Sequence, residues 1–288
     1  MTTVLTPPRR RIRPVRPGTP RYRRPPLLTC AGTLLLLLLL LALLGPLAAP
    51  YSPTAQLAAP FQPPDGQFLL GTDVLGRDVV SRVLGGGRSI VLTALAGTAA
   101  AGAIGVAVGV LAAMVSRRLG DLLVRCVDAL AVVPALLVVL VLAAGFPGSD
   151  AALVAAVTLA TAPFSTRILR AAGDTVLSSG YVEAALARGD TRRAVLRHDV
   201  LPNIAGPALM DTALRLVASL HLTATAGFLG LGQGGAAPDW GRMVSENVPG
   251  ATLAATPFLA PALLLVGLSV CVGLLAGRLA EAVGRGIA

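Results

Sequence analysis

The feature that most constrains this chain is a series of long apolar segments. Eight consecutive leucines run from Leu34 to Leu41 inside a longer apolar stretch, residues 27–48. A stretch of roughly 20 apolar residues is long enough to cross a bilayer as a helix. Five more such segments follow, at residues 90–115, 122–144, 151–168, 204–227 and 257–276. We therefore predict an all-α integral membrane protein with six transmembrane helices.

The first apolar segment has a second interpretation. It follows a basic region and ends in Leu-Ala-Ala-Pro, a pattern that also resembles a secretory signal peptide. Its apolar run is longer than a usual signal core, so we favour a retained first helix. Residues 1–26 hold eight arginines among repeated prolines, and we expect them to form a disordered cytoplasmic tail. Binding of anionic lipid or nucleic acid is an alternative for this tail, but we favour a solvated segment that sets topology and predict no nucleic-acid partner.

The basic residues exclude one function class. All 24 of them are Arg, and Lys is absent. A P-loop uses a Lys to reach nucleotide phosphates, so this chain carries no P-loop, and ATP-driven work would require an ATPase on another polypeptide. The three cysteines stand singly, at Cys30, Cys126 and Cys271, which indicates neither a disulfide nor a metal site.

The arginines also predict the orientation of the chain in the membrane. With the N-terminus inside, 19 of the 24 lie on the inner side, four lie on the outer side, and Arg215 lies within the fifth span. Cytoplasmic segments of membrane proteins carry an excess of positive charge. We therefore predict a multi-pass protein of the bacterial plasma membrane with both termini cytoplasmic. Residues 49–88 would then be extracytoplasmic, and residues 89–288 would form the core domain of five helices.

A charged block interrupts the apolar segments at residues 178–203. It contains Glu-Ala-Ala at 183–185, then Gly189 after three further residues, and closes on Leu-Pro at 201–202. Alanine favours helix, glycine takes the left-handed conformation that ends a helix, and the polar residues that follow offer an N-cap. We therefore predict two short helices joined at Gly189, on the cytoplasmic side. On charge alone, an ordinary basic loop is the simpler interpretation.

The spacing of this block resembles the EAA loop of permease subunits in ATP-binding-cassette (ABC) importers. In that family the loop is a coupling helix that docks into a groove on a separate ATPase subunit. The resemblance implies a type I ABC importer permease fold with a coupling helix–turn–helix. It assigns ATPase coupling to Glu183, Ala184, Ala185, Gly189, Leu196, Leu201 and Pro202. One position departs from the pattern, because Asp199 stands where the family usually has an apolar residue or His.

A second block, GTDVLGRDVVSRVLGGG at residues 71–87, precedes the second span. Opposite charges spaced four apart, Asp73 with Arg77 and Asp78 with Arg82, predict a short interfacial helix that ends at the glycines. A surface helix with no role beyond packing is the simpler interpretation. The block nevertheless resembles the segment before the second span in the C-type permeases of dipeptide, oligopeptide and nickel importers. That resemblance assigns an extracytoplasmic motif to Gly71, Thr72, Asp73, Gly76, Arg77 and Asp78.

A third block, GFLGLGQGGAAPDWGRM at residues 227–243, resembles the same class and adds Trp240 and Gly241 to the extracytoplasmic motif. The simpler alternative is a glycine-rich loop in which Trp240 anchors the membrane interface. The three blocks follow one another in the order found in the family, which favours membership of this permease class.

Ionisable residues inside a membrane span are costly and are treated first as functional. Asp211 and Arg215 are spaced four apart in the fifth span, and we favour a structural ion pair over a contact with substrate. His221 is more simply a packing residue, and Thr223 stands where relatives often carry Glu. We keep these four as possible pathway residues. Asp128, in the third span, is unassigned.

These observations together predict a permease subunit that forms half of a translocation pathway for short peptides, with nickel or another small solute as the alternative within the class. The expected partners are a second, homologous permease subunit, two ABC ATPase subunits, an extracytoplasmic solute-binding protein and the lipid bilayer. ATP and Mg²⁺ are expected on the ATPase subunits, and the permease is expected to bind no cofactor or metal and to catalyse no reaction. An ion-coupled secondary transporter, which would use buried carboxylates and no ATPase, is the alternative of a different class.

Overall fold

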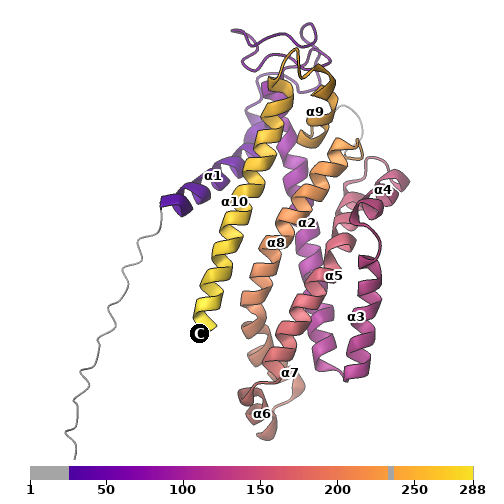
Figure 1. Cartoon of the computed structure of the whole chain (residues 1–288), viewed down its shortest axis with the longest axis vertical. Coiled ribbons are helices and arrows are strands. Elements are labelled where there is room, and N and C mark those ends of the chain that lie inside the picture. Colours follow the sequence, from indigo (N-terminus) through magenta and orange to yellow (C-terminus); the bar gives the residue numbers. More distant parts are fainter. Residues whose placement is uncertain (1–25, 233–236, 288) are drawn as a thin grey trace, which may run out of the picture.

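The chain folds into an elongated bundle of helices (Figure 1). The computed structural model describes residues 26–232 and 237–287. The longer helices are α1 (Pro26–Leu44), α2 (Val79–Met114), α3 (Arg117–Ala131), α4 (Ala135–Gly145), α5 (Asp150–Leu177), α8 (Leu201–Phe228) and α10 (Thr256–Ile287). The shorter elements are η1 (Gly45–Leu47), α6 (Gly180–Ala187), α7 (Arg192–Val195), η2 (Leu196–Val200), α9 (Trp240–Asn247) and η3 (Val248–Gly250). The predicted tail, apart from its last residue, lies outside the described residues.

The six predicted spans correspond to α1, α2, α3 with α4, α5, α8 and α10. Among the described residues, α1 with η1, α2, α5 and α10 are each long and apolar enough to cross a membrane, and α3 with α4 would make a fifth span. α8 has 28 residues, as many as α5, but Asp211, Arg215 and His221 interrupt its apolar surface. The described part of the chain contains no β-strand, in keeping with the all-α prediction.

The third predicted span is wrong as a single straight helix. α3 ends at Ala131, α4 begins at Ala135, and the two helices are bent by 74°. Pro134 lies at the break, where its ring and its missing N–H prevent α3 from continuing. As a result α3 packs along α2 and α5, whereas α4 packs against α5 with a different direction (Figure 1).

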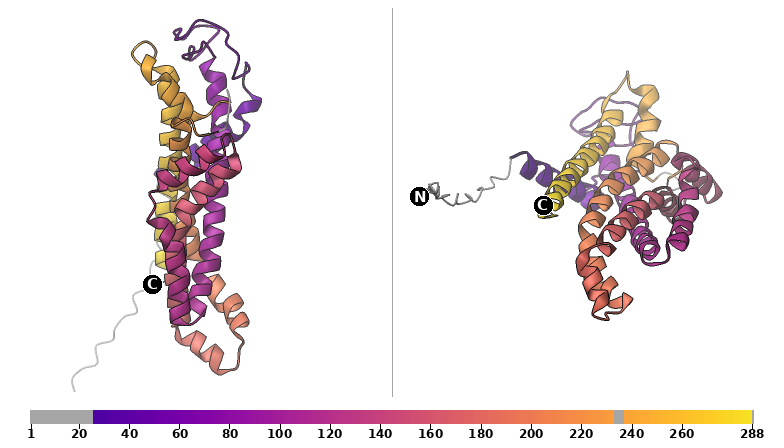
Figure 2. Two further views of the ribbon diagram at one scale, coloured as in Figure 1. Left: turned by 90° about the vertical axis from the view of Figure 1, so that its right-hand side faces the viewer. Right: turned by 60° about the horizontal axis from the view of Figure 1, so that its bottom comes forward.

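The centre of the bundle is formed by α2, α5 and α8, with α3 and α4 beside α5, and α10 beside α8 (Figures 1 and 2). Small residues let α2 and α5 approach closely. A Cβ added at Gly105 would lie 2.7 Å from the Cβ of Ser165, and one added at Gly109 would lie 2.8 Å from the carbonyl oxygen of Thr166. Such small-residue contacts are the usual means of helix association in lipid. They bring polar side chains at the middle of these helices within reach of one another.

The predicted interfacial helix over residues 71–87 is wrong. The block begins with a non-helical turn in which Gly71 and Gly76 both have a φ of +73°, and α2 starts only at Val79. The three glycines lie inside α2 and do not end a helix. Glycine is required there because the ring of Trp240, from α9, occupies the space where two of the side chains would lie.

Candidate functional site

The sequence blocks lie at opposite ends of the bundle. Residues 178–203, which contain α6 and α7, form one end (Figure 1). We call them loop 178–203. The other end combines the block before α2 with α9 (Figure 1). We call residues 71–82 and 239–247 the charge clamp.

The turn of loop 178–203 has the geometry predicted from its sequence. α6 ends at Ala187, and Gly189 has a φ of +92°, the left-handed conformation that favours glycine. The N–H of Asp190 donates to the carbonyl oxygen of Ala185 over 3.1 Å, which satisfies a carbonyl at the end of α6. The hydroxyl of Thr191 then accepts from the N–H of Ala194 over 3.2 Å and caps α7. The predicted helix–turn–helix is confirmed.

The second helix of the loop runs into α8 without a break. α7 passes through the π turn η2, and α8 begins at Leu201. Pro202 lies in the first turn of α8 and has no N–H to donate to the preceding turn, which favours the wider π turn at this point. α7, η2 and α8 therefore form one continuous helical segment.

Loop 178–203 is held to the bundle by apolar contacts. Its buried side chains pack on the neighbouring ends of α2, α5 and α8, and the buried cluster consists of Val110, Val182, Ala185, Val195, Val200 and Ile204. Burial of a valine or isoleucine side chain contributes about 1.5–3 kcal/mol. The opposite face of α6 is exposed, and it carries Glu183, Ala184 and Leu186. α6 therefore presents a face to a partner while its other face is seated on the bundle.

One polar contact links the loop to α2. The Nη1 of Arg192 donates to the carbonyl oxygen of Met114, at the C-terminal end of α2, over 3.2 Å. A cation at this position also interacts favourably with the helix dipole. The pair of Arg188 with Asp190 is 3.4 Å long and both side chains are largely exposed, so it contributes little. Sequence reasoning missed the role of Arg192, because its carbonyl partner lies 78 residues earlier.

The charge clamp is centred on the carboxylate of Asp73, which is fully buried. Its oxygens accept from the backbone N–H of Leu75 over 2.8 Å and of Arg77 over 2.9 Å. They also accept from Nε of Arg77 over 2.7 Å and from Nη1 of Arg82. The predicted pair of Asp73 with Arg77 is confirmed. Such a buried carboxylate is stable only because every oxygen is bonded to a donor.

The other predicted pair of this block is wrong. Arg82 bonds to Asp73, whereas Asp78 is the N-cap of α2 and accepts from the N–H of Ser81 over 2.8 Å and from its hydroxyl over 2.6 Å. The carboxylate of Asp78 is taken up by the capping bonds to Ser81, while Arg82 is taken up by Asp73 and Glu246. Arg82 is completely buried, and its Nε and Nη2 have no hydrogen-bond partner among the described residues.

Glu246 of α9 joins the two parts of the charge clamp. Its Oε2 accepts from Nη2 of Arg77 over 2.8 Å and from Nη1 of Arg82 over 2.9 Å. The side-chain oxygen of Asn247 accepts from the N–H of Val74 over 3.0 Å. Sequence reasoning missed Glu246. The only signal for it is an acidic residue shortly after the Trp-Gly pair. The clamp thus ties together segments about 170 residues apart.

Trp240 and Gly241 complete the packing of this end. Trp240 is fully buried and donates its Nε1–H to the carbonyl oxygen of Val83 over 2.7 Å, so the alternative of an interfacial anchor is wrong. A Cβ at Gly241 would lie 2.9 Å from the backbone N of Phe228, which shows how closely α9 approaches α8. Beside them, burial raises the pKa of Asp239 to about 6, partly offset by hydrogen bonds from the backbone N–H groups of Arg242 and Gly241.

The predicted pair in the fifth span also forms. Nε of Arg215 donates to Oδ1 of Asp211 over 3.2 Å, and the hydroxyl of Ser165 donates to Oδ2 over 2.5 Å. Asp211 is buried between α5 and α8, and the guanidinium of Arg215 lies over the ring of Phe164. The unassigned Asp128 pairs with Arg167 of α5 over 2.7 Å. Ser165 and Phe164 were missed because neither residue type carries a charge signal.

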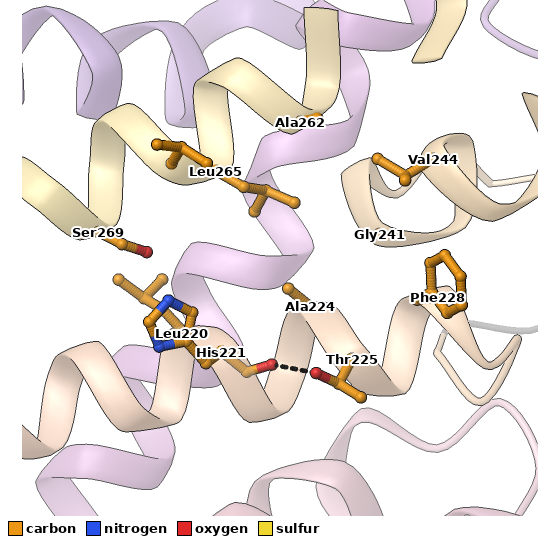
Figure 3. Close-up of a pocket in the computed structure, with 11 residues that line it drawn as sticks. Leu220, His221, Ala224, Thr225, Phe228, Gly241, Val244, Ala262, Leu265 and Ser269 are labelled. Atoms are coloured by element: carbon orange, nitrogen blue, oxygen red, sulfur yellow. Dashed lines mark hydrogen bonds between the residues drawn. The ribbon is translucent and has the colours of Figure 1, made fainter. Parts of the chain in front are cut away.

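His221 and Thr223 lie on different faces of α8. His221 lines a cavity of about 360 Å³ between α8, α9 and α10, where its imidazole and Ser269 lie on facing sides of the gap (Figure 3). Thr223 is buried and donates to the carbonyl oxygen of Ser219 over 2.8 Å. The hydroxyl of Ser219 in turn lies 2.9 Å from that of Thr98 on α2. The four possible pathway residues therefore do not form one site.

Comparisons with known proteins fit this arrangement. Residues 105–285 match the family described as the binding-protein-dependent transport system inner membrane component. The probable D,D-dipeptide transport system permease protein DdpC of Escherichia coli (strain K12) is 31% identical over 223 residues, which cover 77% of this chain and 75% of the relative. The di/tripeptide transport system permease protein DppC of Pseudomonas aeruginosa (strain UCBPP-PA14) is 33% identical over 219 residues, covering 74% and 72%. Among solved structures, a chain of the MetNI methionine ABC transporter in inward facing conformations aligns over 70% of this chain and 96% of its own length, with 20% identity and a TM-score of 0.58.

The apolar helices and the match to a chain of MetNI define an all-α, multi-pass membrane fold. The chain belongs to the family of binding-protein-dependent transport system inner membrane components. It is therefore the membrane-spanning subunit of an ABC importer, a class that works with ATPase subunits and a solute-binding protein.

Proposed function

We propose that this chain imports short peptides, as half of a heterodimeric permease with a second, homologous subunit. Two relatives that are 31% and 33% identical over about three quarters of the chain carry names that specify dipeptide or di/tripeptide transport. The observation that carries the mechanism is the two-faced loop 178–203. Its inner face is seated on α2 and α5, its outer face is free for a partner, and its second helix continues into α8. Nickel or another small solute is the alternative cargo.

Loop 178–203 would be the site at which ATP hydrolysis is coupled to transport. The exposed face of α6, with Glu183, Ala184 and Leu186, would dock into a groove of an ATPase subunit, and the turn at Gly189 would fix the angle of α7. Closure of the two ATPase subunits on ATP would then move the loop as a rigid body and tilt α8. ATP and Mg²⁺ would be bound by the ATPase subunits, and this chain would bind no cofactor and catalyse no reaction.

The orientation follows from the same assignment. ATPase subunits are cytoplasmic, so loop 178–203 and both termini would lie in the cytoplasm, in agreement with the distribution of arginines. The charge clamp, at the opposite end of the bundle, would face the extracytoplasmic binding protein. Its buried ion pairs would keep that end in one conformation while the loop end moves.

The ion-coupled secondary transporter receives less support. It would need buried carboxylates that exchange protons or ions. Asp128 and Asp211, the two candidates in the spans, are each paired with an arginine, Arg167 and Arg215. Each carboxylate is thus already bonded to a cation of this chain, which leaves it less available to bind a transported cation.

Co-purification tests the proposed function directly. The chain would be expressed together with a second permease subunit, ATPase subunits and a solute-binding protein from the same organism, and the complex would be reconstituted into proteoliposomes. We expect uptake of a labelled dipeptide that requires both ATP and the binding protein. Uptake driven by an ion gradient in the absence of ATPase subunits would contradict the proposal.

A further inference from the structure

Arg215 lies where a positive charge is costly. It stands near the middle of the 28-residue helix α8, roughly 20 Å from either end at a rise of ~1.5 Å per residue. Phe164, over which its guanidinium lies, is likewise near the middle of the 28-residue helix α5. A charge at this depth is tolerated when it faces a bundle interior, a water-filled cavity or an opposite charge. The surroundings of Arg215 therefore indicate what this face of the chain meets.

The ion pair with Asp211 occupies one edge of the guanidinium. Nε of Arg215 donates to Oδ1 of Asp211 over 3.2 Å, and Asp211 is held from the other side by the hydroxyl of Ser165. The Cζ of Arg215 lies 5.2 Å from the centroid of the Phe164 ring. Within the described residues, neither terminal nitrogen of Arg215 has a hydrogen-bond partner. The guanidinium is thus fixed by two neighbours and leaves its terminal fork open.

The side chain that carries this open fork reaches the surface of this chain. The side chain of Arg215 is 19% exposed, and the neighbouring Phe164 is 42% exposed. Both lie on the face where α5 and α8 run side by side. Lipid on this face would leave four N–H groups of a buried cation without acceptors, at a cost of several kcal/mol. Water or an anionic group would satisfy them.

We propose that Arg215 is a mid-membrane binding residue for the carboxylate of the transported solute. The proposal rests on the proposed function, in which this face lines the translocation pathway. The fork of a guanidinium matches the two oxygens of a carboxylate, such as the C-terminal group of a short peptide. Asp211 is a positioning residue. It orients the guanidinium and partly neutralises it, so that the carboxylate binds weakly enough to be released.

The test compares two solutes that differ in this group alone. The complete transporter in proteoliposomes is given dialanine or its C-terminal amide, each on a binding protein whose loading is measured separately. We expect the wild type to take up dialanine faster than the amide.

Arg215→Gln keeps a donor for Asp211 but loses the charge and the fork. It should lower dialanine uptake about tenfold, as expected for loss of a charged hydrogen bond, and leave amide uptake unchanged. Thr212→Ala, on the same helix, is the control and should leave the ratio of the two rates unchanged.

Each outcome decides between carboxylate binding and a structural role. Arg215→Lys keeps the charge without the fork and should reduce the preference for dialanine by less than Arg215→Gln does. If Arg215→Gln does not assemble, the preference of Arg215→Lys for dialanine tests the carboxylate site on its own. The proposal would be overturned if Arg215→Gln lowered uptake of both solutes equally, or left the ratio of dialanine uptake to amide uptake unchanged. A third result would also overturn it: Arg215→Lys keeps the full preference for dialanine, and Arg215→Gln no longer binds the second permease subunit. Arg215 would then pair with that subunit and not with the solute. A wild type that takes up neither solute with ATP would refute the proposed function itself, and the carboxylate site with it.

Discussion

The two ends of this molecule are held together in opposite ways. The charge clamp buries Asp73 and Arg82 completely and links them through Glu246 to a segment far away in the sequence. Loop 178–203 is seated by apolar side chains, and a hydrogen bond from Arg192 links it to α2. Buried ion pairs depend steeply on distance and direction, whereas apolar contacts are non-directional. The comparison indicates one end that keeps a single geometry and one end that tolerates movement.

Removal of the central carboxylate should have the largest effect on the structure. Asp73→Ala removes the buried carboxylate shared by Arg77 and Arg82 and leaves them only the half-buried Glu246. Breaking a buried ion pair by removing one member typically costs about 3–5 kcal/mol. We expect a lower thermal midpoint in detergent and lower yield of folded protein. Asp174→Ala is the matched control, because its pair with Arg170 is 3.7 Å long and 56% exposed on the Asp side, and it should change stability little. Similar stability of the two variants would contradict the account of the clamp.

Asp239 should make the stability of the clamp end depend on pH. Burial raises the pKa of this carboxyl in the folded protein from 3.8 to about 6, so the folded state binds the proton more tightly than the unfolded state does. Its contribution to stability is therefore greatest below pH ~4, falls as the pH rises towards 6 and is constant above that. The change is on the order of 3 kcal/mol. Asp239→Asn retains a cap for α9 but does not titrate. Between pH 4 and 6, the unfolding free energy of the wild type should therefore fall relative to that of Asp239→Asn. A difference that does not vary with pH would contradict this origin.

The turn of the loop should respond more modestly than the clamp. Gly189→Val places a β-branched residue at a φ of +92°, a strain of roughly 1–3 kcal/mol. The space around Gly189 is open, so the cost comes from the backbone alone. We expect weaker transport from a protein that still inserts and folds. Gly180→Ala is the control within the same helix pair, because its φ lies outside the left-handed region and nothing lies near the added Cβ. Equal transport by both variants would argue against a fixed turn.

Sequence reasoning succeeded where the signal was local. The turn at Gly189 and the i,i+4 pair of Asp211 with Arg215 depend on residues a few positions apart, and both are found in the structure. It failed where tertiary contacts override a local pattern. Residues 71–78 carry helical charge spacing, yet a turn is stabilised instead by the buried pair of Asp73 with Arg82, which also bonds to Glu246.

The other two differences have different origins. The break at Pro134 is a local signal that was overlooked within a long apolar run. The glycines at 85–87 have the pattern of a helix end, but they accommodate the ring of Trp240, which lies more than 150 residues later in the sequence. Neither block carries a pattern that indicates contact with the other, so their packing could not be predicted from one sequence.

The exposed face of α6 provides the most direct test of the central claim, which is that loop 178–203 couples this permease to its ATPase. Glu183→Ala removes an exposed carboxylate without touching the buried cluster beneath it. A charged hydrogen bond is worth about 1.5–3 kcal/mol, so association with the ATPase should weaken roughly ten- to a hundredfold. Asp190→Ala, an exposed carboxylate of the same loop outside α6, is the control. We predict that solute-stimulated ATP hydrolysis and uptake fall together in Glu183→Ala, with the thermal midpoint of the permease unchanged. Unchanged ATPase association and stimulation in this variant would contradict the claim.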